Sequence, residues 1–196
     1  PAVVFAAALC PFAATTYYVS PSGSDSKPGT PQSNAWQTVE KVKNYAWTPG
    51  FGPGDKVLFE GGKTFSVTAS DYLYIQADRT NGTAASPMTF GSYGTGKATI
   101  SAAASNAVMV WLPASATELG LAFHDLIFAG DGRRTSDKDG KAYGIVVWSA
   151  SSSAPDYLLV ENCEFSGFGG DGFLCGKDEN AAYMTNVTIR HCKAYD

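Results

Sequence analysis

Charged residues make up 16% of the chain, and their density is unusually high in residues 130–141. The members of this run that offer useful chemistry are Asp131, Arg133, Arg134, Asp137 and Asp139. Three aspartates in one loop supply the oxygen ligands that calcium prefers, although the spacing and the final glutamate of an EF-hand loop are missing. Arginines can hold carboxylates in bidentate geometry. We therefore predict a calcium site at the aspartates, a catalytic role for Arg133 and a substrate-binding role for Arg134, with a solvated loop as the alternative.

Further candidates lie closer to the end of the chain. Asp171 stands between two glycines, in a turn that exposes its carboxylate and makes it a candidate catalytic acid. His191 is a candidate general base, because its unperturbed pKa lies near neutral pH. Lys177 and Trp148 are assigned to substrate binding, since an ammonium group donates hydrogen bonds and an indole ring offers an apolar platform. The alternatives are a turn residue for Asp171, a stacked turn residue for His191 and ordinary packing for Trp148.

The elements that position these residues repeat along the chain. Residues 159–165 are echoed by residues 188–194, with Cys163 and Cys192 at equivalent positions 29 residues apart. A fainter copy at residues 122–128 lies 37 positions before the first of these. A repeat of roughly 20–50 residues with one short strand pattern in each copy indicates a β-solenoid.

The alignment of the copies brings Asp125, Asn162 and His191 to one position. We interpret this position as a turn ladder, in which polar side chains of successive coils lie above one another, with a catalytic set as the alternative. Cys163 and Cys192 should stack inside the solenoid as small buried residues. The odd number of cysteines after residue 15 argues against a disulfide framework.

Short strand patterns also precede the repeats. They lie at residues 16–19, 56–60, 64–67, 71–76, 87–90, 98–100 and 108–111. One helix is predicted at residues 35–46, where apolar residues recur at helical spacing and Ser33 or Asn34 can cap the start. Trp36 and Trp47 are expected to pack with this helix. The pattern predicts an all-β fold, a right-handed parallel β-helix whose N-terminal end is sealed by a short capping helix.

The composition of the chain bears on its cellular location and on the partners that it can bind. The net charge is −4 and the pI is about 5.1, so no basic surface for nucleic acid is expected. Residues 2–14 are small and apolar, which is typical of a secretory signal peptide and too short for a membrane span. We predict a signal-peptide remnant at residues 1–15 and, at residues 16–196, the N-terminal part of a β-helix domain truncated at its C-terminus. The expected protein is a monomer that is secreted, periplasmic or on the cell surface.

Several segments resemble pectate-lyase-like right-handed β-helix proteins. These segments are residues 17–25, 36–39, 53–65 and 87–96, together with the two cysteine-containing repeats. The resemblance extends over most of residues 16–196 and implies an exported protein that acts on polysaccharides. Because one fold hosts many activities, the resemblance predicts the fold more specifically than the reaction.

Two reactions fit the candidate residues. A lyase that acts on a uronate polymer needs a base and a cation or arginine to stabilise the developing charge. A glycoside hydrolase needs two carboxyl groups about 5–10 Å apart. We expect a polysaccharide lyase or a glycoside hydrolase that acts on an acidic polysaccharide, with the lyase placed ahead. The alternative function is a non-catalytic polysaccharide-binding or cell-surface adhesin β-helix.

Overall fold

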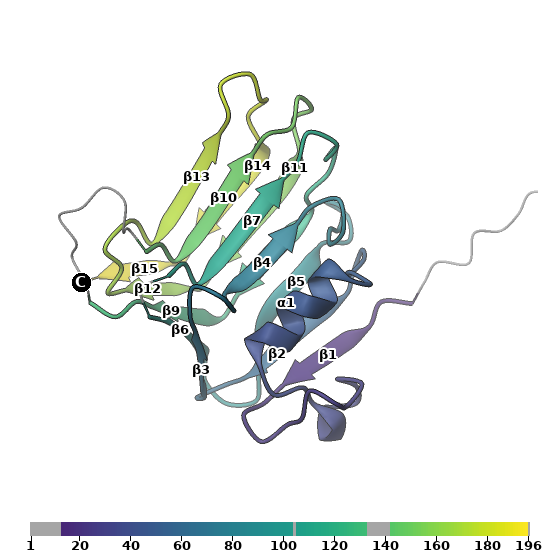
Figure 1. Cartoon of the computed structure of the whole chain (residues 1–196), viewed down its shortest axis with the longest axis vertical. Coiled ribbons are helices and arrows are strands. Elements are labelled where there is room, and N and C mark those ends of the chain that lie inside the picture. The colour runs from purple at the N-terminus through teal and green to yellow at the C-terminus, as the bar shows by residue number, and fades with distance from the viewer. Residues whose placement is uncertain (1–12, 104, 133–141, 196) are drawn as a thin grey trace, which may run out of the picture.

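The computed structural model describes residues 13–103, 105–132 and 142–195, which form three parallel sheets around one interior (Figure 1). Sheet A contains, in spatial order, β1 (Thr16–Val19), β2 (Lys56–Glu60), β5 (Met88–Tyr93), β8 (Leu121–His124), β11 (Asp156–Glu161) and β14 (Thr185–Arg190). Sheet B contains β3 (Thr64–Val67), β6 (Ala98–Ala102), β9 (Leu126–Ala129), β12 (Glu164–Ser166) and β15 (Lys193–Tyr195). Sheet C contains β4 (Leu73–Gln76), β7 (Val108–Leu112), β10 (Ile145–Ser149) and β13 (Phe173–Lys177).

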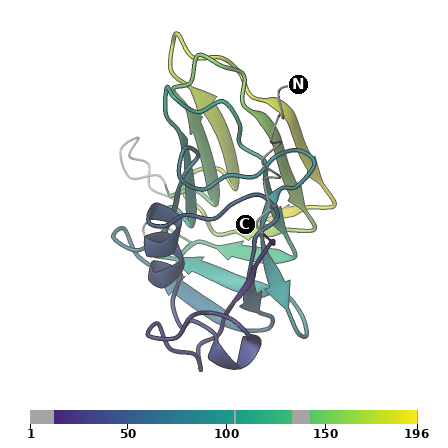
Figure 2. The ribbon, with the colours of Figure 1, turned by 90° about the vertical axis from the view of Figure 1, so that its right-hand side faces the viewer.

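The chain visits sheets A, B and C in turn and completes four such coils between β2 and β13. The coils stack along the long axis of the molecule, as Figure 2 shows. Every pairing between named strands is parallel, so the predicted parallel β-helix is confirmed.

The strand register explains the repeat spacing seen in the sequence. Sheet A pairs residues 33, 33, 37 and 29 positions apart, at Lys56–Thr89, Met88–Leu121, Leu121–Leu158 and Leu158–Val187. The last two values are the spacings of the three sequence copies. The coil with the 37-residue spacing has its extra length between β9, which ends at Ala129, and β10, which begins at Ile145. Both strands stay in register with their neighbours.

The interior is filled by side chains that stack from coil to coil. Phe90 and Phe123 lie parallel with ring centroids 5.3 Å apart, and Phe128 stacks on Phe165 at 5.2 Å. Cys163 is fully buried, and burial raises the pKa of its thiol to about 12. Since Glu164 pairs with Lys193, Cys192 lies beside Cys163 on the next coil, as predicted. Among the described residues the cysteines are free thiols.

The helix α1 (Val39–Trp47) begins later than the sequence predicted. Thr38 is extended and its side chain accepts a hydrogen bond from the Lys41 backbone N–H at 3.1 Å, so Thr38 is the N-cap. Ser33 and Asn34, the predicted caps, belong instead to the short 3-10 helix η1 (Gln32–Asn34).

The helix α1 packs against β4, the edge strand of sheet C (Figure 1). It thus takes the place that a sheet C strand of the preceding coil would occupy. Its apolar side, formed by Val39, Val42 and Ala46, is buried. The predicted capping helix is confirmed, because α1 covers apolar side chains that the first coil would otherwise expose.

The two tryptophans assigned to the helix region behave differently. Trp36 is 1% exposed and stacks on Tyr17 at 4.9 Å, which confirms the predicted packing role. Trp47 contacts Tyr74 of β4 and Arg79 but is 46% exposed, so it packs only in part. It follows the buried Ala46 at the end of α1, on a side of the helix that does not face the core. In the described residues no helix has the length and apolar character that a bilayer crossing requires.

Candidate functional site

The predicted ladder lies where the chain turns from sheet A to sheet B. Asp125, Asn162 and His191 follow β8, β11 and β14, and their φ angles are 58°, 51° and 55°. This left-handed conformation costs most side chains free energy, but short polar residues such as asparagine and aspartate adopt it more readily. The Asn162 side-chain amide donates a hydrogen bond to Asp125 Oδ1 at 2.6 Å, so the ladder is confirmed between these two coils.

A second polar row runs beside the ladder, at the last residues of β8, β11 and β14. The register aligns His124 with Glu161 and Glu161 with Arg190. The Arg190 Nε–H donates to Glu161 Oε1 at 2.8 Å, and His191 Nδ1 lies 3.6 Å from the same oxygen. His124 Nδ1 lies 2.9 Å from Asp125 Oδ2.

The two rows form an open groove of about 500 Å³. We call it the polar corner, and its lining residues are His124, Asp125, Glu161, Asn162 and His191. Each of these residues presents a hydrogen-bonding group, so the groove suits a polar ligand with many hydroxyl groups.

The neighbours of the two carboxyl groups keep them ionised. Burial tends to raise the pKa of Asp125, but hydrogen bonds from His124 and Asn162 outweigh burial, and the pKa is lowered overall. The hydrogen bond from Arg190 lowers the pKa of Glu161. Both groups therefore favour the carboxylate form, which accepts hydrogen bonds or a proton.

A related ion-pair network lies on sheet B, next to the polar corner. Lys97 Nζ donates to Glu164 Oε1 at 2.8 Å, and the Tyr195 hydroxyl donates to Glu164 Oε2 at 2.9 Å. The hydrogen bond from Lys97 lowers the pKa of Glu164. The network ties β12 to β15 and to residue 97, just before β6, and so fixes the strands that follow the corner.

Two of the three predicted catalytic residues are described, and they line different pockets. His191 lies in the polar corner with 75% of its side chain exposed. Asp171 lines another pocket, of about 440 Å³, together with Gly170, Gly172 and Tyr195. Arg133 lies outside the described residues.

Of the three aspartates in the predicted calcium site, the structure describes Asp131. The backbone N–H of Gly132 donates to Gly167 O at 2.9 Å, which holds Asp131 near the pocket of Asp171. Asp137 and Asp139 lie outside the described residues. Within the described ranges, no three histidine, cysteine or acidic residues are grouped to hold a metal ion. Calcium binding by the loop stays a prediction.

The predicted substrate-binding residues lie on and near sheet C. Trp148 alternates with buried neighbours on β10, so it lies on the outer face, where it pairs with Trp111 of β7 and Gly176 of β13. A Cβ atom at Gly176 would come within 2.3 Å of the indole, so this glycine lets the ring lie across β13. The Trp148 Nε1–H donates to Asp178 Oδ1 at 2.8 Å.

Lys177 is engaged by the turn that follows it. Its ammonium donates to the carbonyl oxygens of Asp178 and Glu179 at 3.2 Å and lies 4.7 Å from the ring centroid of Tyr183. These two hydrogen bonds leave one of the three ammonium N–H groups for a ligand. Arg134, the remaining predicted binding residue, lies outside the described residues.

Two members of the polar corner, His124 and Glu161, were not singled out from the sequence. The signal was present, because the residue before the ladder position is polar in each copy, at His124, Glu161 and Arg190. In a parallel β-helix such residues form a row on the outer surface beside the ladder.

No protein-family model matches the chain. It is 41% identical over 81 residues to a lacto-N-biosidase of Bifidobacterium longum subsp. longum, a match that spans 41% of this chain and 5% of that protein. The structure of the present chain is similar to that of GH136 lacto-N-biosidase from Eubacterium ramulus. The TM-score is 0.72 at 20% identity, and the match covers 92% of this chain and 34% of that chain. The chain thus spans about a third of the solved protein.

A rhamnogalacturonan lyase is a more distant structural neighbour. Its TM-score is 0.47 at 18% identity, which is too low to support an argument. The similarity to the Eubacterium protein, at 20% identity, supports the β-helix fold alone.

Proposed function

We propose that the chain is part of a glycoside hydrolase that acts on an oligosaccharide, as its relatives are named to do. The observation that carries this proposal is the 41% identity over 81 residues to a lacto-N-biosidase. A hydrolase takes precedence over the lyase expected from the sequence, because the 41% identity is to a protein named as a biosidase.

The polar corner is proposed to bind the sugar. Its ionised carboxylates at Asp125 and Glu161 can accept hydrogen bonds from sugar hydroxyls, and the Asn162 amide can both donate and accept them. The corner is not proposed as the bond-cleaving centre, because both of its carboxyl pKa values are lowered and a proton donor is needed for hydrolysis.

A neutral sugar is favoured over the acidic polysaccharide expected from the sequence. Two carboxylates lie in the groove itself and Arg190 is already paired with one of them, so the groove has no surplus of positive charge to attract a polyanion. We further propose that the protein is exported and monomeric; the apolar residues 2–14 support export.

The test is an activity assay of the full-length protein on two kinds of substrate. One is an aryl β-glycoside of lacto-N-biose, from which a hydrolase releases the phenol and the disaccharide. The other is a panel of pectin and alginate, from which a lyase produces an unsaturated sugar that absorbs near 235 nm. We expect release from the first substrate without ultraviolet-absorbing product from the second. The reverse result would establish the lyase, and binding without cleavage would establish a non-catalytic module.

A further inference from the structure

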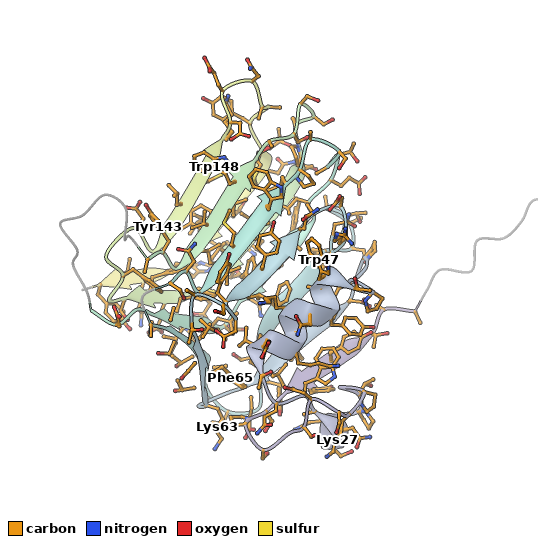
Figure 3. All side chains as sticks on the ribbon, viewed as in Figure 1. Lys27, Trp47, Lys63, Phe65, Tyr143 and Trp148 are labelled. Carbon is orange, nitrogen blue, oxygen red and sulfur yellow. The ribbon has the colours of Figure 1, made fainter. Side chains whose placement is uncertain are left out.

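A groove with aromatic walls lies between the capping helix and sheet C, away from the polar corner. It encloses about 320 Å³, within the size range of small-ligand pockets. We call it the aromatic groove, and its lining residues are Lys43, Asn44, Trp47, Ala69, Ser70, Tyr72 and Tyr74. Figure 3 shows Trp47 at the end of α1, beside sheet C.

The aromatic side chains of the groove are held in place before any ligand arrives. The Arg79 guanidinium lies 4.1 Å from the ring centroid of Trp47, a cation–π contact that orients the indole. The ring of Tyr74 is 6.3 Å from that of Trp47 and 6.4 Å from that of Tyr72. Rigid rings that remain partly exposed lose little entropy on binding, which favours ligand affinity.

Three polar groups of the groove are available to bond to a ligand. In the described part of the chain, the hydroxyl groups of Tyr72 and Tyr74 and the side-chain amide of Asn44 have no hydrogen-bond partner. Burial raises the pKa of Tyr74, so its hydroxyl stays protonated and can donate a hydrogen bond. A ligand that enters the groove therefore meets ring surfaces and free donors and acceptors together.

The charges around the groove balance one another. Lys43 and Arg79 are cationic, Asp71 and Asp78 are anionic, and Lys43 is already tied to the Ser70 carbonyl oxygen. The site therefore offers no net attraction to a polyanion. A neutral pyranose fits better, because its C–H face packs against an aromatic ring while its hydroxyl groups bond to polar neighbours.

We propose that the aromatic groove binds a neutral oligosaccharide, as a site separate from the polar corner. The inference does not depend on hydrolysis, since binding can be measured by itself. A peptide segment could also use aromatic walls. If a peptide is the true ligand, the groove will show no response to sugars.

The site can be followed through the indole N–H signals in nuclear magnetic resonance spectra of the full chain. Its four tryptophans give four such signals, which Trp→Phe variants assign. Titration with lacto-N-biose, chitotriose and cellotriose should shift the Trp47 signal saturably with at least one of them. The signal of Trp36, whose Nε1–H is bonded to Lys27 O at 3.0 Å, should stay unchanged.

Substitutions inside and outside the groove then test whether sugar binding depends on the groove. Trp47→Ala should weaken sugar binding about tenfold or more, and Tyr74→Phe should weaken it while preserving ring packing. Tyr183→Ala is the matched control, because Tyr183 is 78% exposed and lies outside the groove. The proposal is overturned if no neutral sugar shifts the Trp47 signal, if Trp111 or Trp148 responds in its place, or if trigalacturonate binds better than every neutral sugar.

Discussion

At the scale of single residues, the ladder position depends on a backbone conformation that few side chains tolerate. Asn162 has a φ of 51° and bonds to Asp125. We predict that Asn162→Ala lowers the free energy of unfolding by about 1–2 kcal/mol. Asn162→Gly removes the same side chain but accepts the left-handed backbone, so it should lose less. Urea unfolding of both variants measures the difference, and equal losses would show that the hydrogen bond alone matters.

The polar corner makes a second prediction at this scale. If Glu161 binds sugar hydroxyls as a carboxylate, Glu161→Gln should raise KM roughly tenfold, because a charged acceptor bonds a hydroxyl group more strongly than a neutral amide does. Steady-state kinetics of the full-length protein provides the measurement. Glu179→Gln, at an exposed turn residue beyond sheet C, is the control. A fall in kcat with unchanged KM would assign Glu161 to the reaction rather than to binding.

At the scale of elements, the capping helix depends on its N-cap. Thr38 accepts a hydrogen bond from the Lys41 N–H and donates one to Asp25 Oδ2 at 2.6 Å. Thr38→Ala should therefore lower the free energy of unfolding by about 1 kcal/mol, whereas Thr38→Ser keeps the acceptor and should cost less. Thermal unfolding followed by circular dichroism measures both. An unchanged midpoint for Thr38→Ala would mean that α1 is held by packing against β4 alone.

The start of α1 could not be predicted from the local sequence pattern. The helical spacing of Val39, Val42 and Ala46 was visible, and these residues are buried. The start was misplaced because Trp36 also fits that spacing, although it forms a parallel bridge with Val19. A tertiary contact overrode the local pattern, and only the folded chain reveals which residue the tryptophan packs against.

At the scale of the whole molecule, carboxylates with lowered pKa values occur on neighbouring coils. They are Asp125, Glu161 and Glu164. A lowered pKa in the folded state means that the unfolded state binds protons first as the solution is acidified. The stability from these groups is complete above the unfolded pKa values, about 4, and is lost as pH falls through the folded ones.

We therefore predict that the free energy of unfolding drops between about pH 5 and pH 3, in the window set by these lowered pKa values. Glu164→Gln should destabilise the protein at pH 7, by up to about 1 kcal/mol for a partly exposed pair, and should flatten the acid slope. Urea unfolding at several pH values measures both effects. A variant with an unchanged slope would show that Glu164 does not contribute to acid unfolding.

The overall architecture was predictable because it depends on periodicity. Copies spaced 29 and 37 residues apart predicted stacked parallel coils, and the spacing equals the strand register. The sites were less predictable, because a groove depends on which outer residues of different coils meet. His191 was identified but its neighbours His124 and Glu161 were not, and Trp47 was assigned to packing although it lines the aromatic groove.

The lengthened connection between β9 and β10 has a consequence for how such a protein diversifies. The coil that contains it keeps its strands paired with both neighbouring coils, so added residues did not disturb the stack. Because the entropy of closing a loop rises slowly with its length, this edge can accept inserted peptides at little thermodynamic cost. The length of this connection can therefore change over generations while the paired strands preserve the scaffold.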